Sequence, residues 1–216
     1  MPRSKRHKVV SLTKTKAKDK DFKTAQINEL RDAMDEYESV FVFSYENMRT
    51  VVFKQVREHF KGSKIALGKN SLAQTAMGKT VETEFKENMH QMSRKLVGDC
   101  GLLFTDLPKE EVVAYFDELR VADFAKAGVI PKETIVMKPG PLTFPTDMQE
   151  QLRKLGLVVE TNNGVLVLKT GFTVTTKGVA LSPEQAKVLV HMNKKISVFK
   201  VQVTGYWNDG SFEELA

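Results

Sequence analysis

Between residues 22 and 119, short dense apolar runs alternate with stretches in which apolar residues recur every three to four positions. The dense runs are rich in β-branched and aromatic residues, and they predict buried strands at 40–43, 64–67 and 101–104. The spaced positions predict amphipathic helices at 22–37, 48–60, 85–96 and 112–119. Strands that alternate with helices through short links predict a layered α/β domain with a mixed sheet.

The pattern changes after about residue 123, because four prolines and two glycines within residues 128–145 disfavour long regular elements. Beyond them we expect a helix near 148–155 and two short strands joined by the turn Asn162-Asn163-Gly164. A further helix is expected to be capped by Ser182, with Pro183 in its first turn. An alternating apolar segment at 196–203 predicts a last strand, which we expect to rejoin the first sheet.

These changes divide the chain into three parts. A compact segment of about 70 residues that differs from both of its flanks is typical of an insertion within a domain. We therefore predict a basic flexible tail at 1–21, a main α/β domain formed by 22–123 and 194–216, and a small α/β insertion domain at 124–193.

The net charge of +6 is concentrated in two segments. Residues 1–23 carry nine basic residues against two acidic ones, and residues 49–79 carry seven against Glu58 alone, whereas the rest of the chain sums to −7. Two basic blocks predict a polyanionic partner, because Lys and Arg neutralise phosphates and release counterions. The first block has an alternative reading, as a targeting signal or a solvated linker.

Several classes of protein are disfavoured by composition. No apolar run approaches the roughly 18 residues that a membrane helix needs, and the charged beginning does not fit a secretory signal. The single cysteine, Cys100, excludes an internal disulfide and fits a reducing compartment, cytosol or nucleus. The four histidines are scattered without neighbouring ligands, so we predict no metal site. Because no apolar run is long enough to span a bilayer, we also predict no membrane partner.

The segment Met77-Gly78-Lys79-Thr80 matches the end of a phosphate-binding loop. Such a loop needs a glycine five residues before Gly78, where this chain has Ala73, and the segment also lies between predicted helices. We therefore predict no enzyme, no catalytic residue, no cofactor and no small-molecule substrate. A phosphate-using enzyme with weak motifs is the alternative, which loss of nucleotide binding on changing Lys79 would support.

Two strand-to-helix turns carry the candidate binding residues. In Gly68-Lys69-Asn70-Ser71, the glycine would let backbone approach a phosphate, and Asn70 or Ser71 would cap the next helix, whose first amides would face an anion. In the turn from Tyr45 to Arg49, Tyr45 would stack on a base or pack as an ordinary strand end, and Arg49 would pair with a phosphate. Because such turns gather at one edge of a sheet, we expect both to face one RNA.

Together these segments resemble the RNA-binding part of the large-subunit ribosomal stalk-base proteins, the acidic stalk phosphoprotein family. The matching stretches are 40–45, 47–49, 65–72, 101–105, 169–171 and 196–199. Members of that family continue into helices that recruit acidic stalk dimers and then into an Ala-rich hinge, whereas this chain ends at Ala216. With the basic opening at 1–6, this difference resembles the assembly-factor branch of the family. A stalk-base protein that has been cut short is the alternative.

The resemblance implies a factor that occupies the stalk-base rRNA in the nucleolar precursor until the mature stalk protein replaces it. It also implies protein partners in the pre-ribosomal particle, including the neighbouring stalk-base ribosomal protein and a release factor, some of them facing the insertion. The expected location is the nucleus and nucleolus, with shuttling to the cytoplasm left open. A general basic RNA-binding module, which would bind any structured RNA equally, is a second alternative.

The residues expected to contact rRNA come from the tail, the second basic block and the two turns. Of these, the three tail lysines would give supporting phosphate contacts or form a nuclear address. The expected contacts are Lys14, Lys16, Lys18, Lys23, Tyr45, Asn47, Arg49, Lys54, Gly68, Lys69, Asn70 and Ser71.

Overall fold

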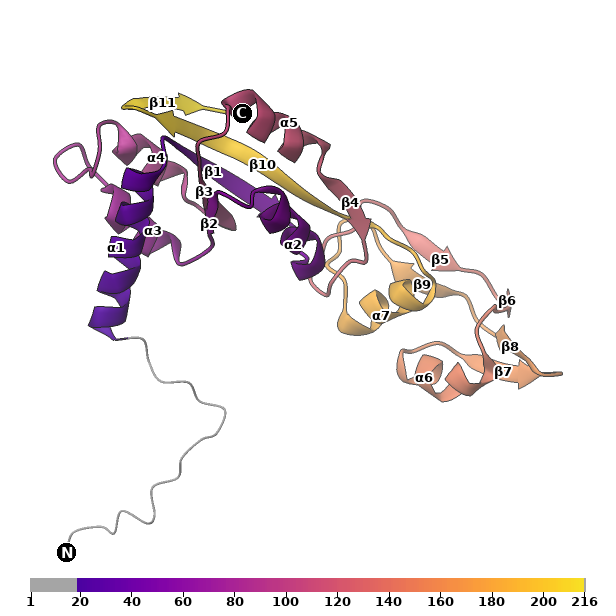
Figure 1. The fold of residues 1–216 in the computed structure, drawn as a ribbon. Helices are drawn as coiled ribbons and strands as arrows, with labels where there is room; N and C mark the ends of the chain where they lie inside the picture. The colour runs from indigo at the N-terminus through magenta and orange to yellow at the C-terminus, as the bar shows by residue number, and fades with distance from the viewer. Residues whose placement is uncertain (1–18, 216) are drawn as a thin grey trace, which may run out of the picture. The chain divides into compact units, whose positions relative to one another are not determined.

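The computed structural model describes residues 19–215 (Figure 1). The described residues form two compact units. The first unit comprises 19–42, 62–106 and 204–215, and the second comprises 43–61 and 107–203. The predicted boundaries of the insertion, 124 and 193, stay a prediction.

The largest sheet has six strands in the order β11-β10-β1-β3-β2, and β4 also pairs with β10. Its strands are β1 (Ser39–Glu46), β2 (Lys64–Ala66), β3 (Cys100–Thr105), β4 (Arg120–Asp123), β10 (Ser197–Asn208) and β11 (Ser211–Glu214). Pairing is antiparallel between β10 and β11, between β10 and β4, and between β2 and β3. The expectation that the last strand joins the sheet of the first strand is confirmed, although β10 is longer than predicted.

In the first unit, three helices share one core with the sheet: α1 (Lys20–Glu36), α3 (Asn70–Met77) and α4 (Met89–Lys95). The core includes Met34, Val42, Met77, Leu102 and Trp207, all buried. Full burial of a Met, Val or Leu side chain stabilises the fold by about 1.5–3 kcal/mol relative to leaving it exposed. The packing of α1 against α3 places the predicted RNA-facing turn at the start of α3 on a fixed support.

In the second unit, α2 (Thr50–His59) and α5 (Lys109–Glu118) meet through an aromatic cluster. The ring of Phe116 lies 5.8 Å from that of Phe43 and 5.4 Å from that of Phe60, and Tyr115 stacks on His59 at 3.9 Å. Because Phe43 belongs to β1, this cluster fixes α2 relative to the strand that precedes it.

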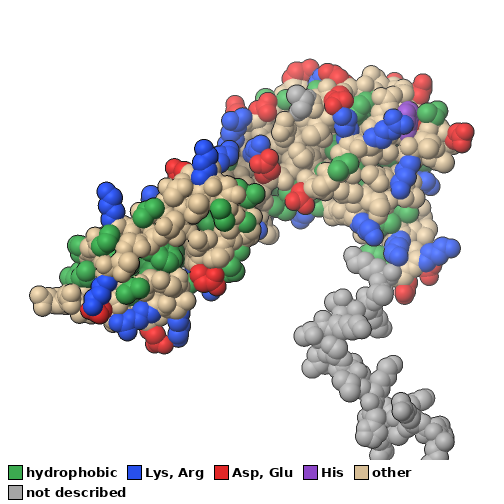
Figure 2. All heavy atoms as spheres, turned by 180° about the vertical axis from the view of Figure 1, so that it is seen from behind, with side chains coloured by type: hydrophobic (Ala, Val, Ile, Leu, Met, Phe, Trp, Pro, Cys, Tyr) green, Lys and Arg blue, Asp and Glu red, His purple; other side chains and the backbone are tan. Residues whose placement is uncertain are grey.

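Residues 124–193 of the second unit form short elements around a core of their own, which includes Leu152, Val159, Leu166, Val174 and Leu189. The elements are β5 (Ile135–Met137), β6 (Gly140–Pro141), η2 (Thr146–Met148), α6 (Gln149–Lys154), β7 (Val159–Asn162), β8 (Val165–Leu168), β9 (Phe172–Thr175) and α7 (Pro183–His191). Strand β5 pairs with β9, and β8 lies between β6 and β7. Figure 2 shows hydrophobic side chains on the surface of this part, where Val136, Val158 and Val179 are more than half exposed.

The predicted α/β class is confirmed. The turn at Asn163 and Gly164 joins β7 to β8 with both residues at positive φ (48° and 78°), as expected for a two-residue hairpin loop. Two expectations were wrong in detail. The helix expected from residue 85 begins only at Met89, because Asn88 directly before it adopts φ 61°, a left-handed conformation that a right-handed helix cannot contain. The short strands β4, β5, β6, β9 and β11 were not predicted.

Candidate nucleic-acid interface

The turn between β1 and α2 is held in place by its own side chains and lies in the second unit. Asn47 adopts φ 55°, a left-handed conformation that Asn tolerates better than most residues, and this reverses the chain after β1. The Asn47 Nδ2 donates a hydrogen bond of 3.0 Å to the Val198 carbonyl on β10. Asn47 therefore fixes the turn.

Arg49 stands at the N-cap of α2 and is paired inside the protein. Its Nε lies 2.6 Å from the Asp123 Oδ2, and its Nη2 donates to the Phe124 carbonyl. The side chains of Arg49 and Asp123 are only 28% and 27% exposed. Arg49 was expected to pair with a phosphate, but its guanidinium is already paired with Asp123 and with the Phe124 carbonyl. Sequence reasoning missed Asp123, because no local spacing links it to residue 49.

Two other residues of this region differ in exposure. Tyr45 is half-buried at the end of β1, which leaves both of its expected roles open. The side chain of Lys54 on α2 is 77% exposed, and its Nζ lies 3.8 Å from Glu58 one turn later. Such an exposed pair is worth at most about 1 kcal/mol, so Lys54 can exchange Glu58 for a phosphate at little cost.

The turn between β2 and α3 lies in the first unit and is more open. Gly68 and Lys69 are exposed, and Asn70 and Ser71 are half-buried. The expectation that Asn70 or Ser71 caps α3 was wrong, since Lys69 is the N-cap residue and no side chain caps this helix. The Asn70 Nδ2 instead donates to the Gly98 carbonyl at 2.8 Å. The start of α3 therefore presents backbone amides beside an exposed lysine, as an anion site requires.

Gly68 is not required by the protein itself. Its φ is in the range that all residues adopt, and a Cβ added there would meet nothing within 4 Å. Any requirement for a glycine at this position would therefore come from a ligand that approaches the turn.

The remaining expected contacts are Lys23 and the tail lysines. Lys23 is exposed in the first turns of α1. Lys14, Lys16 and Lys18 lie outside the described residues. The two turns belong to different compact units, each described by itself, so the expectation that they face one RNA stays a prediction.

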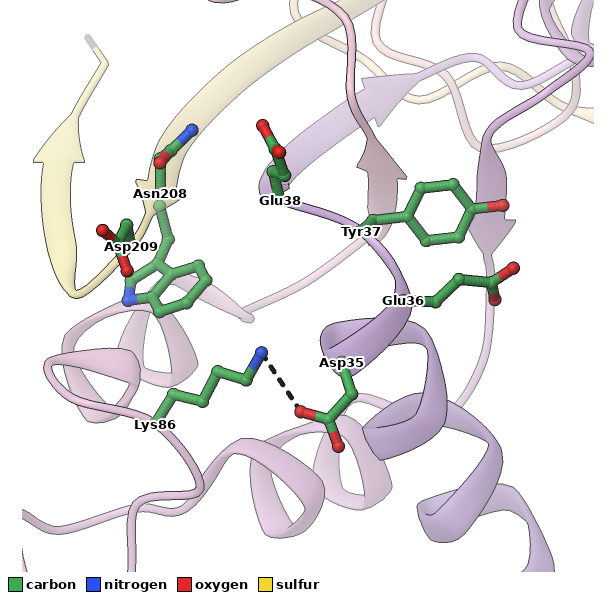
Figure 3. Close-up of a pocket in the computed structure, with 8 residues that line it drawn as sticks. Asp35, Glu36, Tyr37, Glu38, Lys86, Asn208 and Asp209 are labelled. Atoms are coloured by element: carbon green, nitrogen blue, oxygen red, sulfur yellow. Dashed lines mark ion pairs between the residues drawn. The ribbon is translucent and has the colours of Figure 1, made fainter.

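An acidic hollow of about 420 Å³ lies at the other end of α1 from Lys23 (Figure 3). It is lined by Asp35, Glu36, Tyr37, Glu38, Lys86, Trp207, Asn208 and Asp209. Lys86 reaches Asp35 at 3.1 Å and is the only cation among these lining residues. Burial, and next the carboxylates of Glu36 and Asp106, raise the pKa of Tyr37. The hollow repels phosphate, so RNA that contacts the first unit must approach it elsewhere.

Features that suggested other chemistry have structural explanations. The segment Gly78-Lys79-Thr80 follows a helix, as expected, and Gly78 has φ +93° with the Thr83 and Glu84 backbone packed against it. Burial raises the pKa of the Cys100 thiol, which keeps it protonated. Within residues 19–215 there is no cluster of three potential metal ligands, and no helix is long and apolar enough to span a bilayer.

Comparison with known proteins adds family membership to this geometry. A family model described as ribosomal protein L10 matches residues 18–121, and a second model, described as an insertion domain in the 60S ribosomal protein of that family, matches residues 125–193. The ribosome assembly factor mrt4 of Dictyostelium discoideum is 38% identical over 213 residues, which cover 98% of this chain and 96% of that protein. The chain belongs to the Mrt4 family of ribosome assembly factors.

This chain is more similar in sequence to the Mrt4 proteins than to the ribosomal uL10 proteins. The Mrt4 of Saccharomyces cerevisiae is 31% identical over 98% of this chain and 95% of its own length. The large ribosomal subunit protein uL10 of Zea mays is 23% identical over 94% of this chain and 63% of its own length. The recognition of the assembly-factor branch from the sequence is confirmed.

Proposed function

We propose that this member of the Mrt4 family is a non-enzymatic ribosome assembly factor that binds large-subunit rRNA at the stalk base of pre-ribosomal particles. The observation that supports this most directly is the β2–α3 turn, where exposed Lys69 adjoins helix amides that no side chain caps. Lys23 and Lys54 add exposed cations, and Tyr45 adds a base-stacking ring. The basic tail adds affinity that does not depend on RNA sequence.

The mature stalk protein replaces this factor as the particle matures. Relatives named uL10 align with nearly the whole chain, which supports a shared RNA-binding face on the two proteins. Two proteins that use one face cannot occupy the same rRNA together, so replacement follows from competition. The factor acts in the nucleus and nucleolus. Its protein partners there are the neighbouring stalk-base ribosomal protein and a release factor.

Charge reversal at Lys69 tests the site. Lys69→Glu should weaken binding to a stalk-base rRNA fragment about tenfold and flatten the dependence of affinity on salt by about one phosphate contact. Binding is measured by fluorescence anisotropy at several salt concentrations, with an unrelated duplex of equal length as the competitor RNA.

Lys177→Glu is the matched control, because Lys177 is also exposed but lies between β9 and α7 and belongs to neither turn. It should leave affinity within about twofold of the wild type. Equal loss for both variants, or equal wild-type affinity for the two RNAs, would support a general basic RNA-binding module in place of this proposal.

A further inference from the structure

Residues 47–49 of the β1–α2 turn are tied at four points to residues 123–126 and to Val198 on β10. Three ties involve Asn47 and Arg49, which bond to Val198, Asp123 and Phe124 as described above. In the fourth, the Lys126 Nζ donates to the Met48 carbonyl at 3.2 Å. Each of residues 47–49 is therefore held by a partner distant in sequence.

The pair of Arg49 and Asp123 is the strongest of these ties. The Asp123 carboxylate is held from a second side, because its Oδ1 accepts the Phe124 backbone N–H at 2.7 Å. Charged groups that are largely shielded from water attract one another more strongly than exposed pairs do. The pair has no net charge, so a phosphate that approaches it gains little of the attraction offered by the exposed Lys54 or Lys69.

We propose that Arg49 is a positioning residue for RNA binding, which acts through Asp123 to hold the β1–α2 turn in its binding geometry, and not a phosphate contact. This inference rests on the proposed function. It assigns Asp123, an acidic residue, a favourable role in binding a polyanion. Asn47 and Lys126 support the same geometry from either side of Arg49.

Removal of the Asp123 charge should lower RNA affinity, whereas charge repulsion alone would raise it. Asp123→Asn removes a negative charge, yet it should weaken binding to the stalk-base rRNA fragment on the order of tenfold, because the turn loses its anchor. Its salt dependence should match that of the wild type, since no phosphate contact is lost. Asp117→Asn is the matched control, because Asp117 is exposed on α5 in the same unit. It should bind as tightly as the wild type or slightly more tightly.

A charge swap separates positioning from direct contact. Arg49→Asp should weaken binding, and the double variant Arg49→Asp with Asp123→Arg should recover a large part of the loss by restoring an ion pair of reversed polarity. If Arg49 touches phosphate directly, the double variant should stay as weak as Arg49→Asp. Thermal melting identifies any variant that fails to fold. If Arg49→Asp fails to fold, Arg49→Lys replaces it, because lysine keeps the charge but loses the planar fork of the guanidinium.

The possible outcomes separate this inference from the proposed function. Wild-type protein that does not prefer the stalk-base fragment overturns the proposed function and this inference with it. Normal wild-type binding with undiminished binding by a folded Asp123→Asn variant overturns this inference alone. A flattened salt dependence for Arg49→Asp, with normal binding by Asp123→Asn, would make Arg49 a phosphate contact.

Discussion

At the residue scale, two glycines that look alike in the sequence have different physical requirements. A Cβ on Gly78 would lie 2.3 Å from the Thr83 carbonyl oxygen and 2.4 Å from the Glu84 Cα, and these backbone atoms cannot rotate away. Gly78→Ala should therefore lower the free energy of unfolding by about 2 kcal/mol or more. Gly68→Ala, the matched control, should change it by less than about 1 kcal/mol. Urea unfolding measures both, and equal stability of the two variants would contradict this account.

Residue roles set by short-range geometry were predictable from the sequence, and roles set by distant partners were not. The Asn163-Gly164 turn followed from its conformational preference alone. Asn70 or Ser71 was expected to cap α3, but the Asn70 amide bonds to the Gly98 carbonyl, which no local pattern indicates. Arg49 was expected to be a free cation for the same reason, because Asp123 becomes its neighbour only through the pairing of β4 with β10.

At the element scale, helix capping gives a prediction with an internal control. The Ser182 Oγ accepts the Gln185 N–H at 3.2 Å, and the Gln185 Oε1 accepts the Ser182 N–H at 2.9 Å, so both ends of a capping box are present at α7. Ser182→Ala should cost about 1 kcal/mol of stability. Ser71→Ala should cost less than about 0.5 kcal/mol, because Ser71 lies inside α3 and does not cap it. Chemical denaturation checks both values, and a larger cost at Ser71 would show that the cap was misassigned.

Elements with strong apolar patterns were predicted and short edge elements were missed. The runs at 40–43 and 101–104 lie in β1 and β3, and the run at 64–67 extends one residue beyond β2. The missed strands β4, β5, β6, β9 and β11 have only two to four residues each, so each is defined by its partner strand and not by its own pattern. The candidate turns were correctly placed between their strands and helices. Their presence on one edge stays a prediction.

At the scale of the whole molecule, the distribution of charge restricts how RNA can bind. The first unit carries exposed Lys23 near the start of α1 and an acidic hollow near its end, where Asp35, Glu36, Glu38 and Asp209 gather. These ends are separated by most of a 17-residue helix, about 25 Å long. The hollow therefore repels phosphates from its end of the unit, so an RNA that binds this unit must approach it elsewhere.

The central claim is that this chain occupies the stalk base of precursor large-subunit rRNA. The most direct measurement is crosslinking of the protein to RNA in cells, followed by sequencing of the crosslinked RNA. Crosslinks should concentrate on the stalk-base segment of precursor rRNA, and Lys69→Glu should reduce them whereas Lys177→Glu should not. Crosslinks spread evenly over rRNA, or concentrated on another segment and insensitive to Lys69, would contradict it.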